Sequence, residues 1–175
     1  MQVINIFSLG DVTADELGHS LNELNFVDTL HSFTAKHNHA HSISDMSPIY
    51  DSDDEPPKFD ELITLYPSAV TKYFAPSDLS GIGGMHSECV CATHIWRKEG
   101  PHYDTVFVNT NSDEDSMHGL DVTWVRQFFS FRCQGCIHPC AVIQWYSHYG
   151  DEPYEGIGMW VINLRCMKMV SILLI

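Results

Sequence analysis

Apolar residues recur at three- and four-residue spacing over residues 11–36, the first patterned stretch of the chain. This spacing predicts one amphipathic helix whose apolar stripe packs on a core. Thr13 is followed three residues later by Glu16, as in a capping box that satisfies unpaired N–H groups at a helix start. A partner-binding helix is the alternative interpretation. The stripe consists of Leu17, Leu21, Leu24, Phe26 or Val27, Leu30 and Phe33.

From residue 89 onward the apolar pattern has a period of two, which is typical of half-buried strands. We expect strands at 103–109, 125–133, 137–146 and 158–163. A turn at Gln134-Gly135 would join the second and third into a hairpin. Strands with such short connections predict a small antiparallel sheet or a partly open barrel. The expected core residues are Tyr103, Phe107, Phe129, Phe131, Cys140, Trp145 and Trp160.

Between these regions the periodicity fades. Residues 37–60 have little apolar patterning, and acidic residues crowd the stretch 51–61 beside two prolines. Such a block stays solvated and extended, so we expect a linker rather than a calcium loop, whose spacing and central glycine are lacking. Residues 62–80 are again apolar and predict a short helical or turn-rich piece. A flexible glycine turn at 81–84 would follow it.

These patterns predict an α+β chain in four parts. We expect a helical arm at 1–36, an acidic disordered linker at 37–60, an α+β domain with a C-terminal β-sheet at 61–163, and an aberrant tail at 164–175. The strand order suggests an SH3-like barrel or a bromo-adjacent-homology (BAH-like) barrel of the kind found in chromatin proteins, a comparison that rests on fold analogy.

Charge and composition narrow the function. The chain has 175 residues, 23 acidic and 9 basic, with a formal net charge of −14. Lysine and arginine are too scarce and scattered to neutralise a phosphate backbone, which argues against direct nucleic-acid binding. Apolar runs fall far short of the roughly 20 residues that span a bilayer, so no membrane partner is expected. Without a recognisable signal peptide, the cysteines are expected to be reduced thiols inside the cell.

The densest chemical signal is a run of potential zinc ligands, Cys133, Cys136, His138 and Cys140. Thiolates at C-x-x-C spacing with a following imidazole are a common zinc-binding motif. In a strand, the last three side chains would also share one face. Two observations argue against zinc binding by this run. The four potential ligands are crowded within eight residues, and Cys140 fits a core position equally well. A small zinc-binding module is therefore an alternative function.

Other chemical groups are less specific. The histidines of HNHAH (His37, His39 and His41) indicate a solvated linker. Cys89 and Cys91 are too close together for tetrahedral chelation alone, and strand positions on one face explain them better. The sequence has no G-x-S-x-G elbow and no papain-like or kinase-like motif. A hydrolase that uses an unrecognised Cys–His pair is a second alternative, supported by residue availability only.

Longer strings carry a family resemblance. The chain contains, in order, YPSAVTKYFAPSDLSGIGGMHSE, WRKEGPHYDTVFVNT, MHGLDVTWVRQFFSF, HPCAVIQWYSHYGDEP and GMWV. Over about residues 59–161 it resembles the C-terminal region of transposase-like proteins encoded by Plavaka-type transposons of mushroom-forming fungi. The resemblance implies a non-catalytic accessory region that contacts an unknown protein or chromatin partner. It implies no catalytic residues, no cofactor and no metal, and nuclear residence follows only from the family's role.

Departures from the family pattern also carry information. The family has other residue types where Cys133, Cys136 and His138 stand, so only Cys140 matches and the zinc hypothesis weakens. After GMWV the family continues into a long acidic and then helical extension, whereas here INLRCMKMVSILLI follows. We therefore expect a truncated or degenerate copy without the catalytic core. Missing closing strands would leave an unpaired sheet edge, so we expect marginal stability and a tendency to aggregate.

Overall fold

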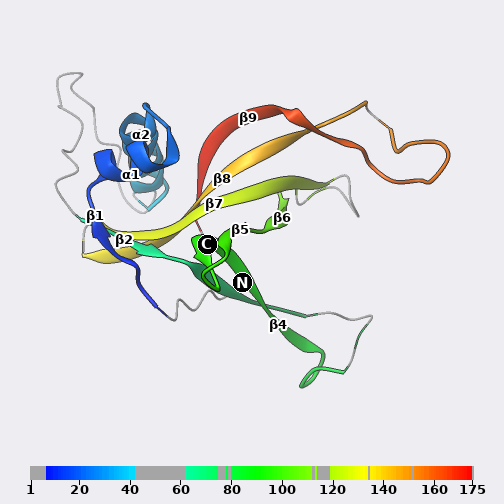
Figure 1. The fold of residues 1–175 in the computed structure, drawn as a ribbon, viewed down its shortest axis with the longest axis horizontal. Coiled ribbons are helices and arrows are strands. Elements are labelled where there is room, and N and C mark those ends of the chain that lie inside the picture. Colours follow the sequence, from blue (N-terminus) through cyan, green and yellow to red (C-terminus); the bar gives the residue numbers. More distant parts are fainter. Residues whose placement is uncertain are drawn as a thin grey trace.

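The computed structural model describes residues 7–41, 62–74, 78, 80–111, 113, 119–133, 135–150 and 152–174. The expected α+β class is confirmed, with helices beside antiparallel strands (Figure 1). The helices are α1 (Ala14–Leu21) and α2 (Phe26–His41). The strands are β1 (Gly10–Val12), β2 (Ile63–Tyr66), β3 (Ser68–Phe74), β4 (Met85–Trp96), β5 (Gly100–Tyr103), β6 (Thr105–Asn109), β7 (Leu120–Cys133), β8 (Cys136–His148) and β9 (Ile162–Leu174).

The strands form two sheets. The larger has the order β1-β2-β7-β8-β9 with β6 also paired to β7, and the smaller has the order β3-β4-β5. The chain passes from one sheet to the other at Pro67, the single residue between β2 and β3, whose carbonyl accepts the Ala92 N–H at 2.8 Å. A second tie is the 3.0 Å hydrogen bond from the Val125 N–H to the Asp104 carbonyl. The two sheets are thus joined through backbone contacts.

The helices cover one face of the larger sheet (Figure 1). Phe26 packs edge-on against Phe129 at 6.0 Å between ring centroids, and Phe33 packs in the same way against Phe131 at 6.4 Å. Burial of apolar area is the main stabilising term at such a contact. This first core cluster consists of Ala14, Leu17, Leu21, Phe26, Leu30, Ile63, Phe129, Phe131, Cys140 and Val142.

A second core cluster contains residues of both sheets. Ala69 and Ala92 come from the smaller sheet, and Val125, Phe128, Ala141 and Ile143 come from the larger one. Side chains alternate between the faces of a strand, so neighbours such as Phe128 and Phe129 enter different clusters. Strands β7 and β8 are consequently apolar on both faces, as expected for strands covered on both sides.

The prediction of a single helix at 11–36 is wrong, because the structure has two helices in this region, α1 and α2. The capping box at its start is confirmed: the Glu16 N–H donates to Thr13 Oγ1 at 3.2 Å, and the Thr13 N–H donates to the Glu16 carboxylate at 2.8 Å. Asn22 then adopts a left-handed conformation with φ +58° and ends α1. Asparagine tolerates this conformation better than most residues, which makes it a frequent helix C-cap. Leu24 falls in the break and is 85% exposed.

Two expected boundaries also change. The HNHAH motif belongs to α2, which ends at His41, and is not part of a linker. The remainder of the expected acidic linker lies outside the described residues. The apolar stretch at 62–80, expected to be helical or turn-rich, instead forms β2 and β3. The glycine turn at 81–84 is confirmed, with Gly83 and Gly84 at positive φ.

The hairpin of β7 and β8 is confirmed, with Phe129 opposite Cys140 and Cys133 opposite Cys136. The strand expected at 103–109 is divided at Asp104 into β5 and β6, which belong to different sheets. The strand expected at 158–163 begins only at Ile162.

That strand, β9, continues to Leu174 and pairs with β8. Residues 164–174 of the stretch expected as an aberrant tail are therefore sheet structure. Its β-branched Val170 and Ile172 suit a strand.

The core prediction is confirmed for Phe129, Phe131 and Cys140, all buried in the first cluster. Tyr103 and Trp145 are partly buried against the second cluster. The prediction of a core position for Phe107 is wrong, since this residue is 59% exposed. Its strand β6 pairs with β7, and burial alternates so that Val106 and Val108 are the more buried residues. Trp160 is half-buried and belongs to neither cluster.

We predict that Phe129→Ala lowers the free energy of unfolding by about 3 to 5 kcal/mol, because it removes a fully buried ring from the first cluster. Phe107→Ala is the matched control and should change that free energy by less than about 1 kcal/mol. Urea unfolding followed by tryptophan fluorescence measures both. Equal losses in the two variants would contradict the observed burial.

A second prediction concerns pH. Burial raises the pKa of the Cys140 thiol from 9.0 to about 12. The unfolded chain therefore loses this proton at lower pH than the folded chain, so Cys140 leaves stability unchanged below pH 9 and reduces it progressively as the pH rises to about 12. Urea unfolding at pH 7 and pH 10 should show a smaller pH-dependent loss in Cys140→Ala than in the parent. An identical loss would be evidence against this assignment.

Candidate functional site

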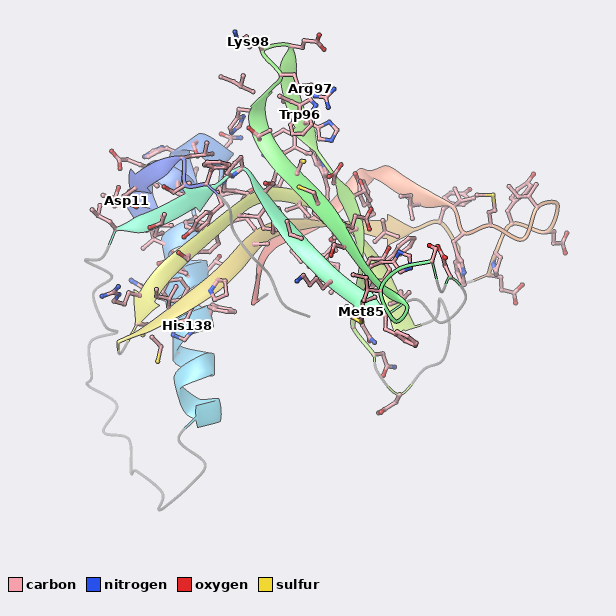
Figure 2. All side chains as sticks on the ribbon, turned by 90° about the horizontal axis from the view of Figure 1, so that it is seen from below. Asp11, Met85, Trp96, Arg97, Lys98 and His138 are labelled. Carbon is pink, nitrogen blue, oxygen red and sulfur yellow. The ribbon has the colours of Figure 1, made fainter. Side chains whose placement is uncertain are left out.

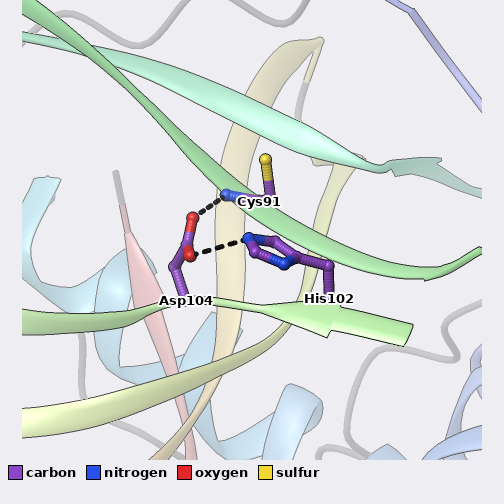
Figure 3. Close-up of side chains that lie close together, drawn as sticks. All are labelled: Cys91, His102 and Asp104. Carbon is purple, nitrogen blue, oxygen red and sulfur yellow. Dashed lines mark hydrogen bonds and ion pairs between the residues drawn. The ribbon is translucent and has the colours of Figure 1, made fainter. Parts of the chain in front are cut away.

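Among the described residues, one group of three metal-ligating side chains has ligand atoms that all lie within 4.8 Å of one another (Figure 3). The group is Cys91 of β4, His102 of β5, and Asp104 immediately after β5. Ala92 lies opposite Tyr103 in this antiparallel pair, so Cys91 and Asp104 are also opposite each other. His102 is two residues from Asp104 and shares its face, because side chains alternate along a strand.

Asp104 holds this group together. One carboxylate oxygen, Oδ2, accepts the Cys91 backbone N–H at 2.7 Å, and the other, Oδ1, lies 3.1 Å from His102 Nε2. The Asp104 backbone N–H donates to the Cys91 carbonyl at 2.9 Å, and its carbonyl accepts the Val125 N–H at 3.0 Å. The carboxylate is therefore fixed at the junction of the two sheets.

The imidazole of His102 is positioned by aromatic stacking. The Trp96 ring lies 5.1 Å from the His102 ring, with 25° between their planes. The Arg97 guanidinium lies over the Trp96 ring, 5.4 Å from its centroid. Figure 2 shows Trp96, Arg97 and Lys98 at the projecting end of the β4–β5 hairpin. Arg97 and Lys98 both have positive φ, as the tight turn requires.

Cys91 is 5% exposed, and its thiol has a pKa raised to about 11. Burial is the main cause, followed by the charge and hydrogen bond of Cys89 and the charge of Asp104. A thiol with this pKa is protonated at neutral pH and is a weak nucleophile. The group thus contains the residue types of the Cys–His hydrolase hypothesis, but the electrostatics of Cys91 disfavour nucleophilic catalysis.

The zinc ligands expected from the sequence lie elsewhere, at the end of the β7–β8 hairpin. Cys133 and Cys136 face each other across the hairpin, His138 stacks on Phe131 at 5.1 Å, and Cys140 is fully buried in the first core cluster. No three of these four residues have ligand atoms within 4.8 Å of one another in the described structure. The expected zinc ligands are spread along the hairpin instead of surrounding one point.

A second feature is an open pocket of about 640 Å³ in the loop between β8 and β9, which extends away from the sheets (Figure 1). Backbone hydrogen bonds order this loop: Tyr149 N–H donates to the Val161 carbonyl at 2.7 Å, and Gly158 N–H donates to the Tyr154 carbonyl at 2.9 Å. The lining residues are Tyr149, Gly150, Glu152, Pro153, Tyr154, Glu155, Gly156 and Val161.

Sequence reasoning missed both features. It judged Cys89 and Cys91 by themselves and did not pair them with His102 and Asp104. The available signal was two pairs with i, i+2 spacing, C-x-C and H-x-D, in consecutive strand candidates. The pocket was hidden because a strand was expected over part of its loop.

No helix in the described ranges combines the length and apolar character needed to cross a membrane. A comparison of the chain with protein-family models, curated proteins and solved structures finds no match.

Proposed function

We propose that this chain is a non-catalytic interaction module that binds a basic segment of a protein partner, such as a chromatin protein. The observation that carries the proposal is the pocket of the β8–β9 loop, which combines two tyrosines with two glutamates. Its volume lies within the range of pockets that hold a ligand or a side chain.

The lining chemistry suits lysine or arginine. The faces of Tyr149 and Tyr154 attract a cation by about 0.5 to 1 kcal/mol at an exposed site. The carboxylates of Glu152 and Glu155 add charge complementarity, while Pro153 and Val161 offer apolar contact to the aliphatic stem of a basic side chain. The net charge of −14 also favours encounter with a basic partner.

Exposed apolar side chains on the same loop support a protein partner. Ile157, Met159 and Tyr154 are 63 to 65% exposed. Contiguous exposed apolar residues commonly mark interaction sites. A basic peptide that placed one side chain in the pocket could cover these residues with its neighbours.

For the architecture, we propose a partly open barrel of the SH3-like or BAH-like kind. Its support is the continuity of β2 and β3 through Pro67 and the shared second core cluster between the sheets.

For the origin, we propose an accessory region of a Plavaka-type transposase-like protein, a non-catalytic remnant of a transposable element. The sequence resemblance over residues 59–161 is the support. We predict that genomic DNA upstream of the gene, translated in all frames, encodes the catalytic region of such an element, and that downstream DNA encodes the family's acidic extension. A single-copy locus with neither sequence nearby would contradict this origin.

For the binding function, we predict that a fluorescein-labelled peptide rich in lysine and arginine binds the full chain, as measured by fluorescence anisotropy. The double variant Glu152→Gln/Glu155→Gln should weaken binding by about three- to ten-fold, because two exposed charge contacts are lost. Added salt should weaken binding by the parent protein more than binding by the variant.

The matched control is Glu88→Gln/Glu99→Gln, which removes the same charge from exposed positions outside the pocket. It should bind nearly as well as the parent. Equal weakening in both double variants would assign binding to net charge alone and would contradict a site in the loop. Tyr154→Ala should weaken binding without any change in charge.

A further inference from the structure

We propose that Cys89, Cys91, His102 and Asp104 form a zinc site that fastens β4 to β5. This site is separate from the pocket of the β8–β9 loop and does not depend on the proposed function. Its geometry rests on the group of Cys91, His102 and Asp104, whose ligand atoms already lie within 4.8 Å of one another.

The spacing of the ligands follows from the strand pair. A C-x-C pair on β4 and an H-x-D pair at β5 place four potential ligands on one face of two adjacent antiparallel strands. C-x-C alone is too short to surround a metal ion, but ligands from the neighbouring strand complete the set. The result is an S₂NO donor set, and thiolates with imidazole favour zinc over calcium or magnesium.

The separation of the nitrogen and oxygen ligands is close to that in a tetrahedral zinc site. Zinc bonds of about 2.0 to 2.3 Å imply ligand separations of about 3.3 Å between nitrogen and oxygen, and about 3.6 Å between nitrogen and sulfur. His102 Nε2 and Asp104 Oδ1 are 3.1 Å apart. The Cys91 sulfur lies within 4.8 Å of both atoms. The Cys89 thiol lies outside this group of three but forms a hydrogen bond with the Cys91 thiol, which places it beside the same centre.

The surroundings of these ligands also fit a metal site. Zinc ligands are usually oriented by a second layer of contacts. Here the oxygen of Asp104 that does not face His102 accepts the Cys91 N–H, and Trp96 stacks on the imidazole. His102 and Asp104 are thus already aligned.

The charge and proton balance of zinc binding at this point is simple. Cys91 is buried, and the Asp104 carboxylate lies beside its thiol in the group of three ligands. A zinc ion among the ligands would stabilise the thiolates directly. Binding of Zn²⁺ by the two thiols releases their two protons to solvent, and no oxidant or reductant is required.

The test is metal binding by the purified full chain after removal of metals with a chelator. Zinc added in excess and then dialysed should remain at about one equivalent per chain. Co²⁺ added alone should produce thiolate-to-cobalt charge-transfer absorption, which requires sulfur ligands. His102→Gln should retain less than about a tenth of an equivalent of zinc, and its partly exposed side chain makes the change compatible with folding.

The remaining variants separate the two possible zinc sites. Cys89→Ser/Cys91→Ser should lose the cobalt absorption, whereas Cys133→Ser/Cys136→Ser, the matched control, should keep both the absorption and the zinc. Circular dichroism checks that each variant is folded. If the parent binds less than about a tenth of an equivalent of zinc, or if the control loses zinc while His102→Gln keeps it, the proposal is wrong.

Discussion

Burial of β7 and β8 on both faces is the constraint on which the rest of this structure depends. Phe129 and Cys140 face the helices, while Phe128 and Ala141 face the smaller sheet. Removing these side chains from water is favourable only if both faces are covered. The helices cover one face of these strands, and the smaller sheet covers the other. The hairpin therefore determines where every other layer lies.

The smaller sheet has a second role because of how it is attached. Pro67 turns the chain out of the larger sheet, and Asp104 returns it through a backbone bond to Val125. Asp104 is also the residue whose carboxylate joins Cys91 and His102. The same residue that ends β5 thus organises the most concentrated group of metal-ligating side chains in the described structure. The group of Cys91, His102 and Asp104 therefore lies at the junction of the two sheets.

Prediction from sequence succeeded where the pattern was local. The capping box of Thr13 and Glu16, the β7–β8 hairpin and the buried Phe129 depend on neighbours in the chain or on simple alternation. It failed at Asn22 and Asp104, where a single residue interrupts a pattern that otherwise continues. Periodicity averages over several residues, so it does not register one left-handed cap or one change of sheet.

The sequence by itself determined the α+β class, the central hairpin and the acidic charge, because these follow from residue type and short-range spacing. Only the tertiary structure decided which chemical groups meet. The sequence gathers Cys133, Cys136, His138 and Cys140 into eight residues, yet a β-hairpin spreads them along its length. Cys91 is separated from His102 and Asp104 by a hairpin turn, yet strand pairing brings them together. Proximity across strands depends on register, and register is set by the burial of both faces rather than by distance along the chain.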